Sequence, residues 1–242
     1  MTQSSPFSRT AFSAPEARSG WFADRVQRQV RTEAPLRVLD IGCGTGEHVF
    51  MLAERMPRAT FRGVDLSPAN IARADGARSV RAAAARISFS CADYMEYRDG
   101  VFDLIVSDSA LHLVPVATPL LLAKIAADLA PGGLLVASMP DCGLYNKALW
   151  RVRGLLAAMR SRWLDELALA VSSRMYRGKY DEAFLRQRIP YLYLLPHRCE
   201  GRELRAAAHA CGLQWLSIEP APHDSVMQPV HVLAIYQRVP VQ

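Results

Sequence analysis

The sequence predicts an α/β protein in which helices cover both faces of a mostly parallel sheet. Short β-branched runs alternate with longer helical segments up to residue 139, which is typical of strand–helix–strand units. The first apolar run ends directly in a glycine-rich turn that opens a helix. At 242 residues, the chain is long enough to bury a full core. We therefore expect one domain with a sizeable insertion.

The elements expected in the first part of the sheet follow in order. Strands are expected at 36–41, 60–65, 86–91, 102–107 and 133–139, with helices at 46–56, 68–84 and 117–130 between them. Ser67 and Pro68 give the second helix an N-cap and a first-turn proline. The Pro-Gly-Gly run at 131–133 is expected to end the third helix.

The alternation fails after residue 139 and returns near residue 201. A helix at 201–211, stopped by Gly212, precedes strands at 213–219 and 230–238, and their connection leaves no room for a crossover helix, so we expect them to be antiparallel. The predicted organisation has four parts: an N-terminal arm and capping helix (1–34), a ligand-binding core (35–139), a helical insertion (140–200), and a C-terminal helix and hairpin that complete the core (201–242).

Charge and composition narrow the classes of partner. The formal net charge of +6 would suit a nucleic acid or an anionic substrate. Arginine, however, greatly outnumbers lysine and is spread along the chain, as a bias in base composition would produce. We therefore do not expect a nucleic-acid partner on charge alone.

The cysteines indicate a reducing compartment. Their number is odd and no C-x-x-C pair occurs among Cys43, Cys91, Cys142, Cys199 and Cys211, so neither a disulfide framework nor a zinc cluster is expected. The N-terminal residues lack an apolar signal region, and the most apolar stretch, 109–139, is interrupted by charged residues and prolines. The expectation is a cytoplasmic protein without a signal peptide or a membrane span.

The segment Val38-Leu-Asp-Ile-Gly-Cys-Gly-Thr-Gly46 predicts a site for a nucleotide-like ligand. Its glycines let the backbone turn sharply and approach a ligand, and the next helix presents unpaired N–H groups. The spacing is G-x-G-x-G, with Glu47 where a dinucleotide fingerprint has its last glycine, and no P-loop lysine follows. An acidic residue before the turn and the absence of a cation for phosphates favour S-adenosylmethionine over NAD or ATP.

On this segment the chain resembles the class I S-adenosylmethionine-dependent methyltransferases, in particular the small-molecule group called type 11. The resemblance implies a Rossmann-like three-layer sandwich with a seven-stranded sheet of order 3-2-1-4-5-7-6, the last strand antiparallel, and a helical lid insertion. It also implies methyl transfer from S-adenosylmethionine to an O, N or C atom of a small molecule.

Five residues at the ends of the first two strands are expected to hold the cofactor most directly. Asp40 closes strand one, where its carboxylate would brace the turn and attract the ligand's ammonium, and Gly42, Cys43 and Gly44 would line the ligand with backbone. Asp65 ends strand two about twenty residues further on, where an acidic side chain accepts both ribose hydroxyls. The alternative for both aspartates is a turn or an N-cap.

Further cofactor contacts are expected at the ends of strands two, three and four. Leu66 is expected to pack on the adenine. By the resemblance, Asp93 beside Tyr94 would hydrogen-bond the adenine amino group, with a simple turn as the alternative, and the main chain around Ser107 would meet the methionine ammonium. Asp103 is expected to brace the sheet.

A base is needed only if the acceptor must lose a proton, because methyl transfer is an in-line displacement on an activated sulfonium. The candidates are His112, just past strand four, His197 and Tyr193 in the run 190–197, and His223 in the last loop. A structural role is the alternative for each. No group of residues has metal-ligand spacing, so no metal is expected.

The insertion at 140–200 carries an amphipathic pattern. Apolar residues recur at helical spacing at Val152, Leu155, Leu156, Met159, Trp163 and Leu167, with Arg153, Arg160 and Arg162 between them. We expect a lid over the carboxyl edge of the sheet, together with the N-terminal helix of Trp21 and Phe22; a homodimer face and a membrane-surface helix are the alternatives.

The same insertion mixes aromatic and basic residues in a way that suits an enclosed pocket for a small, partly apolar, anionic acceptor. These are Tyr145, Trp150, Tyr176, Tyr180, Tyr191 and Tyr193 with Arg174, Arg177, Lys179, Arg186 and Arg188. Two other functions stay open: a nucleic-acid methyltransferase, although the Asn/Asp-Pro-Pro-aromatic motif and a Pro-Cys nucleophile are missing, and a non-catalytic S-adenosylmethionine-binding protein.

Overall fold

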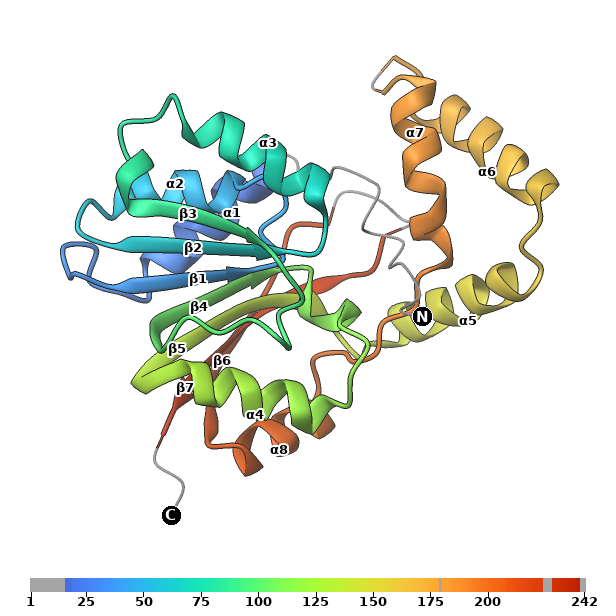
Figure 1. The fold of residues 1–242 in the computed structure, drawn as a ribbon. Helices are drawn as coiled ribbons and strands as arrows, with labels where there is room; N and C mark the ends of the chain where they lie inside the picture. Colours follow the sequence, from blue (N-terminus) through green and yellow to red (C-terminus); the bar gives the residue numbers. More distant parts are fainter. Residues whose placement is uncertain (1–15, 179, 224–227, 240–242) are drawn as a thin grey trace.

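The sheet has the predicted strands in the predicted order. A computed structural model describes residues 16–178, 180–223 and 228–239 (Figure 1). Its single seven-stranded sheet has the order β3-β2-β1-β4-β5-β7-β6. The strands are β1 (Arg37–Ile41), β2 (Thr60–Asp65), β3 (Ile87–Cys91), β4 (Phe102–Asp108), β5 (Leu129–Pro140), β6 (Leu213–Pro220) and β7 (His231–Arg238). Only β7 runs antiparallel to its neighbours, β5 and β6, which confirms the predicted topology.

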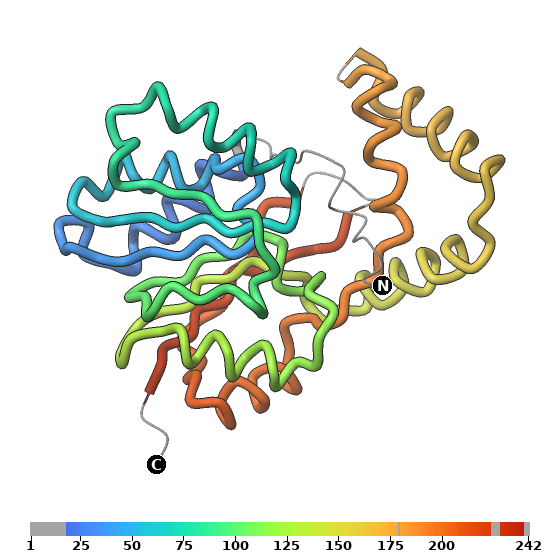
Figure 2. Tube along the Cα trace, viewed as in Figure 1, coloured from blue at the N-terminus to red at the C-terminus, as the bar shows by residue number. Residues whose placement is uncertain are grey.

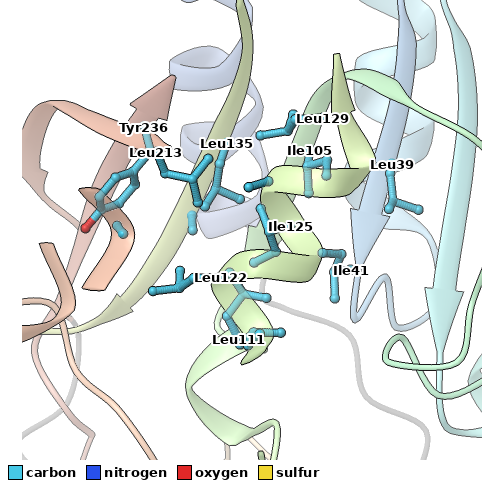
Figure 3. Close-up of a cluster of buried hydrophobic side chains, with 14 of the residues drawn as sticks. Leu39, Ile41, Ile105, Leu111, Leu122, Ile125, Leu129, Leu135, Leu213 and Tyr236 are labelled. Carbon is cyan, nitrogen blue, oxygen red and sulfur yellow. The ribbon is translucent and has the colours of Figure 1, made fainter. Parts of the chain in front are cut away.

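Helices cover both faces of this sheet. One face carries α1 (Glu16–Gln27), α2 (Glu47–Arg55) and α3 (Pro68–Arg78), and the other carries α4 (Thr118–Asp128) and α8 (Arg202–Ala210) (Figure 1). Because a parallel strand is buried on both faces, β1 is apolar on both: Val38 belongs to the core under α1 and α2, and Leu39 to the core under α4 (Figure 3). The fold is therefore a three-layer sandwich, as expected.

The N-terminal helix is part of the core. Phe22, Ala23 and Val26 of α1 are fully buried in the cluster that includes α2. This burial fixes α1 against the sheet and determines where its polar side chains reach. The buried face of α1 is therefore a fixed part of the core.

Two element boundaries differ from the sequence-based prediction. The second helix ends at Arg78, and a short 3-10 turn, η2 (Ala84–Arg86), replaces its last part. The run 131–133 does not end the third helix; α4 ends at Asp128, and these residues form an irregular start of β5. A Cβ at Gly133 would collide with Ala130 O of the same strand at 2.8 Å and would lie 3.1 Å from Asp103 O of β4, so the irregular start of β5 favours glycine there.

The insertion projects beyond the carboxyl ends of the parallel strands (Figures 1 and 2). It contains α5 (Leu144–Ala158), α6 (Arg162–Met175), α7 (Glu182–Arg188) and the 3-10 turn η4 (Ile189–Tyr193). The single amphipathic helix expected from 152 to 167 is wrong, because the chain breaks between α5 and α6. Ser161 has extended backbone and caps α6 by accepting a hydrogen bond from Leu164 N (3.3 Å), and this capping competes with continuing the helix.

A disulfide closes the base of the insertion, contrary to the expectation of none. Cys142 and Cys199 are bonded, with a Cα–Cα distance of 5.5 Å. The two ends of the insertion meet here, since Asp141 and Glu200 form an isolated parallel bridge and Cys142 N donates to Glu200 O (3.1 Å). The 57-residue separation carries no spacing signal, because the pairing depends on where the insertion leaves and rejoins the sheet.

The membrane expectation can be compared with the helices directly. Among the helices of the described ranges, none is both long and apolar enough to cross a bilayer.

Candidate cofactor and acceptor site

The glycine turn after β1 has the backbone that only glycine adopts easily. Gly42, Gly44 and Gly46 all have positive φ, 75°, 55° and 85°. The turn is held against β2, since the amides of Gly42 and Cys43 donate to Val64 O (2.8 and 3.1 Å). A Cβ at Gly42 would collide with the Cβ of Ala110 in the loop after β4. The turn and the end of β4 therefore approach each other as closely as their backbones allow.

Asp40 is a buried carboxyl in need of a cation. It is 2% exposed, and its Oδ2 has no hydrogen-bond partner within the part of the chain that the structure describes. Burial raises its pKa well above the usual value, and the charges of Asp108 and Asp65 raise it further. A cationic group placed here would relieve both the desolvation and the repulsion. The geometry thus suits the ammonium that the sequence analysis assigned to it.

Asp65 connects the glycine turn to the start of α3. Its Oδ2 accepts from Gly44 N (3.0 Å), and its Oδ1 accepts from Ser67 N (2.8 Å) and Asn70 Nδ2 (3.0 Å). Asp65 therefore stabilises the turn before α3, which is the structural role that we considered as the alternative to ligand binding. These bonds also fix the direction of the carboxylate, and Oδ2, which accepts one hydrogen bond here, retains acceptor capacity for a hydroxyl group.

The other predicted cofactor residues divide into two groups. Leu66 is 41% exposed beside Asp65, and Asp93 is exposed while its Oδ1 accepts from Met95 N (2.8 Å). The side chains of Cys43 and Tyr94, in contrast, lie in the core, and the Tyr94 hydroxyl donates to Asp128 (2.9 Å) under α4. Burial raises the pKa of both groups. For these two residues only the main chain remains available to a ligand.

The end of β4 carries an ion pair that sequence reasoning missed. Ser107 Oγ donates to Ile41 O (2.8 Å), which joins β4 to β1. The next residue, Asp108, accepts two hydrogen bonds from the Arg18 guanidinium of α1 (3.0 and 2.8 Å). The same guanidinium reaches Ser109 Oγ (2.7 Å) and Ser138 Oγ at the end of β5 (3.0 Å). Although burial alone would raise the pKa of Asp108, Arg18 holds it well below the usual range.

His48 of α2 completes this network. Its Nε2 lies 3.5 Å from Asp108 Oδ2, and its ring contacts the edge of Phe22. Burial lowers the pKa of His48, and Arg18 lowers it further against the opposing charge of Asp108. A guanidinium, a carboxylate and a neutral imidazole therefore meet at the carboxyl edge of β4.

A second buried histidine accompanies the predicted His112. The rings of His112 and His231 lie 5.5 Å apart, centroid to centroid, and His231 begins β7 opposite Pro140. Burial lowers the pKa of His112 well below the usual value and, with the charge of Arg18, lowers that of His231 to about 4. His112 Nδ1 and His231 Nε2 are buried and make no hydrogen bond to any residue described. Two neutral imidazoles thus have polar atoms that a ligand can satisfy.

The remaining candidate bases lie in different environments. His197 is exposed, and only its main chain meets His112, with His197 N donating to His112 O (2.8 Å). His223 is exposed and contacts Gln228 O (3.0 Å). Tyr193 donates to Asp165 (2.6 Å) inside the insertion; burial and this hydrogen bond raise its pKa to about 12. The structure therefore groups His112 with His231 rather than with Tyr193.

The mixture of aromatic and basic residues mostly serves the insertion itself, which corrects the expected pocket. Tyr176, Tyr180 and Tyr193 pack around a small core of Leu169, Leu185 and Ile189. Arg186 is exposed and pairs with acidic residues of α6 and α7. Lys179 lies outside the described residues.

The sequence contains different amounts of information about three residues of this site that were not predicted. Asp108 directly follows Ser107, so its place at a strand end was available from the sequence. His231 begins the predicted final strand, and antiparallel pairing with the fifth strand would have placed it at the same edge. Arg18 lies 90 residues from Asp108 and carries no motif, so no local pattern indicates their contact.

Comparison with known proteins points to one family. Residues 38–133 match the family model described as a methyltransferase domain. The chain is 41% identical over 104 residues to trans-aconitate 2-methyltransferase of Deinococcus radiodurans, covering 43% of this chain and 38% of that protein. It is 36% identical over 135 residues to the protein of the same name from Streptomyces avermitilis, covering 55% of this chain and 49% of that protein. The chain thus spans half or less of the length of these curated relatives.

A solved structure shares the fold over nearly the whole chain. Magnesium protoporphyrin IX methyltransferase from Synechocystis PCC 6803, with bound S-adenosylhomocysteine, superposes with a TM-score of 0.62 at 15% identity. The match covers 92% of this chain and 83% of that one. At this identity the likeness concerns the fold alone.

Proposed function

We propose that this chain, which belongs to the class I S-adenosylmethionine-dependent methyltransferases, transfers a methyl group from S-adenosylmethionine to an O, N or C atom of a small molecule. The observation that carries the proposal is Asp40, a buried carboxyl whose Oδ2 finds no partner among the residues described, directly before a glycine turn. The expected cofactor has a sulfonium and an ammonium against one carboxylate, so its net charge suits this site.

The residues present fit that cofactor. Asp40 would receive the ammonium, with the main chain near Ser107 beside it, and the amides of the glycine turn would line the methionine part. Asp65 would accept from the ribose hydroxyls, and the exposed Leu66 would pack on the adenine, with Asp93 at its edge. When bound, the cofactor supplies a methyl group on an activated sulfonium, so positioning can provide most of the catalysis.

The acceptor is proposed to be a small carboxylic acid or another anionic metabolite. The curated relatives are named for trans-aconitate, which is such an acid. In this chain the cationic Arg18 lies at the ends of β4 and β5, where Ser138 shares its guanidinium. His112 and His231 add two buried nitrogen atoms that would bind acceptor hydroxyl or carboxyl groups. Either imidazole is unprotonated at neutral pH and would accept a proton from the acceptor, although its lowered pKa makes it a weaker base than an ordinary histidine.

Calorimetric titration and a labelled-methyl assay test these steps separately. We expect S-adenosylhomocysteine to bind more tightly than NAD, and label to appear in small carboxylic acids, trans-aconitate among them. Tighter binding of NAD would overturn the cofactor assignment. Substitution of His112 or His231 by Asn should reduce turnover while cofactor affinity is retained; loss of cofactor affinity would assign these residues to the cofactor instead.

The same assay distinguishes the two other functions. Label appearing only in RNA or DNA would replace the small acceptor by a nucleic acid. Tight cofactor binding without label in any acceptor of a metabolite extract would favour the non-catalytic binding protein. The missing nucleic-acid motifs and the placement of the insertion over the carboxyl edge favour the small molecule.

The proposal includes a cytoplasmic location. It leaves open whether the chain forms a homodimer. Cytosolic thiols are normally held reduced, so the Cys142–Cys199 disulfide is the observation that opposes this location. Alkylation of thiols in intact cells, followed by mass spectrometry, decides: labelled Cys142 supports the cytoplasm, and a protected pair contradicts it. Light scattering gives the oligomeric state.

A further inference from the structure

The insertion exposes an unusual amount of apolar side chain. On α5 the exposed residues Val152, Leu155 and Met159 follow one helical stripe, and on α6 Trp163 and Leu167 begin a second one that continues every fourth residue through Val171 and Met175. Leu155, Met159 and Trp163 are 66, 69 and 72% exposed. Contiguous apolar surface of this kind marks an interaction site in a folded protein.

The apolar stripes do not face the insertion's own core. The buried side of α6 is carried by Leu169, which packs against Leu185 of α7 and Ile189 of η4. The exposed residues of α6 therefore lie on its other sides. At the α5–α6 corner, Met159 is the C-cap of α5 and Trp163 is the second residue of α6. This corner lies at the margin of the molecule in the view of Figures 1 and 2.

The same segment carries nearly all of the chain's net charge. Residues 144–177 contain seven Lys or Arg and two Asp or Glu, a net charge of +5, whereas the whole chain has +6. Five of these cations are exposed and take part in no ion pair with any described residue: Lys147, Arg151, Arg162, Arg174 and Arg177. A surface that is both apolar and strongly cationic needs a partner that is both apolar and anionic.

We propose that α5 and α6 dock on the surface of a bilayer that contains anionic phospholipids, with the α5–α6 corner in the headgroup layer. Trp163 suits the interface because its ring is apolar while its indole N–H can reach water or headgroups, and Met159 would insert beside it. Arg162 and Arg174 would bind lipid phosphates while their aliphatic stems lie along the apolar surface. Neither helix is long and apolar enough to span the bilayer.

Charge decides between a bilayer and a second copy of this chain. A symmetric dimer through these helices would bring two patches of net charge +5 together. An anionic lipid surface instead attracts each basic residue, and every contact near the surface raises partitioning about fivefold. The docking proposal does not depend on methyl transfer, so its test uses binding alone.

Sedimentation with vesicles tests the proposal on the full-length protein. Vesicles of phosphatidylcholine alone are compared with vesicles containing 30% phosphatidylglycerol, at low and high salt. We expect binding to the anionic vesicles only, and at least tenfold weaker binding at high salt because exposed charges are screened. No binding to anionic vesicles, or equal binding to both compositions, would overturn the proposal.

Two sets of substitutions locate the surface. Met159→Ser with Trp163→Ser should reduce partitioning at least tenfold, and Arg151→Gln, Arg162→Gln and Arg174→Gln together should reduce it about a hundredfold. Val80→Ser and Arg58→Gln with Arg73→Gln are matched controls, because these residues are equally exposed on the other end of the fold. Circular dichroism verifies that each variant folds.

The same variants distinguish a bilayer from a second copy of this chain as the partner of the surface. If the Met159 and Trp163 substitutions convert a dimer to a monomer in light scattering and leave vesicle binding unchanged, the surface is a contact between copies and the membrane proposal is wrong. Equal losses in the control variants would show non-specific attraction and would overturn it as well. Losses confined to the α5–α6 variants support it.

Discussion

The carboxyl edge of the sheet and the insertion beyond it place polar and apolar side chains in opposite ways. At the edge, Asp40, His112 and His231 are buried inside a frame of strands and helices, and each has a polar atom without a partner among the residues that the structure describes. In the insertion, Trp163 and its neighbours are apolar and exposed, while the charged pair Arg186–Glu166 lies at the surface. The edge therefore offers buried polar atoms to a small polar ligand, whereas the insertion offers an extended apolar surface to a larger partner.

The difference also concerns what holds each region together. The edge is part of a sheet whose two cores contain most of the buried apolar residues. Among its described residues, the insertion has one small core cluster of its own, in which Leu169, Leu185 and Ile189 are buried and tyrosines pack around them. We therefore expect the stability of the insertion to depend on the disulfide at its base. We expect the stability of the edge to depend on its backbone geometry.

The largest expected effect is on the base of the insertion. Cys142→Ser should lower the free energy of unfolding by about 4 kcal/mol under oxidising conditions, because a loop of this length regains its chain entropy. Cys199→Ser should have the same effect, and the double variant no more than either. Urea denaturation measures it, and a reductant should abolish the difference from the natural protein. An unchanged affinity for S-adenosylhomocysteine is expected throughout; its loss would mean that the two regions are not separable.

Gly42→Ala should lower the free energy of unfolding by about 3 kcal/mol, because the alanine would have to adopt a positive φ and its Cβ would collide with Ala110. Calorimetry should show loss of cofactor affinity, while the insertion's own proteolysis pattern stays the same. Gly76→Ala is the matched control, since a Cβ there meets nothing within 4 Å. Adding Ala110→Gly should restore part of the affinity; no recovery would contradict the collision.

Asp65→Ala should weaken cofactor binding by about 1.5–3 kcal/mol, since two hydrogen bonds to a charged acceptor are lost. Gly44 N and Asn70 lose their partner in the same variant, so thermal stability should fall too. Asp75→Ala, which removes only a surface pair with Arg78, serves as the control. Affinity unchanged in Asp65→Ala would return this residue to a purely structural role.

Cofactor affinity should rise with pH because of Asp40. Its raised pKa means that the carboxyl of the ligand-free protein stays protonated to higher pH than an ordinary aspartic acid. A bound ammonium favours the ionised form, so binding releases a proton and affinity increases by at most about tenfold per pH unit, until the pH passes the pKa of the free protein. Titration calorimetry in buffers of different ionisation enthalpy measures this release. Asp40→Asn should remove it, and a pH-independent affinity in the natural protein would contradict the assignment.

The smallest effect concerns closure of the insertion. If it acts as a lid, hydrogen exchange in 140–178 and 180–200 should slow on cofactor binding, because its mobility falls. The buried face of α1 should change little, since Phe22 and Val26 are already packed in the core. Identical exchange in the insertion with and without cofactor would leave the bilayer surface as its remaining proposed partner.

The sequence was most informative where local chemistry decides the structure. The alternation of strands and helices up to residue 139, the N-cap at Ser67 and the turn at Gly42 follow from patterns a few residues long, whereas the order of the strands in the sheet came from the resemblance to a known family. The break at Ser161 did not follow, because capping and helix propagation compete closely there and the apolar repeat continues across the break.

The site was predicted in part for the same reason. Asp40, Asp65 and Ser107 lie at strand ends that a parallel sheet gathers at one edge. The pairs Arg18–Asp108, His112–His231 and Cys142–Cys199 join segments distant in the chain, and only the assembled sheet brings them together. Tyr94 lies beside Asp93 in the sequence, but its side chain turns into the core, because sequence position does not determine the direction in which a side chain points.

The buried side chain of Arg198 links the two regions mechanically. It donates to the carbonyls of Leu111, Val114 (2.8 Å) and Val116 (2.6 Å), so the loop that carries His112 is fastened to the chain where it returns from the insertion. A guanidinium with that many acceptors acts as a rigid joint. These hydrogen bonds couple the loop of His112 to the end of the insertion, so a displacement of the insertion at Arg198 would also displace that loop.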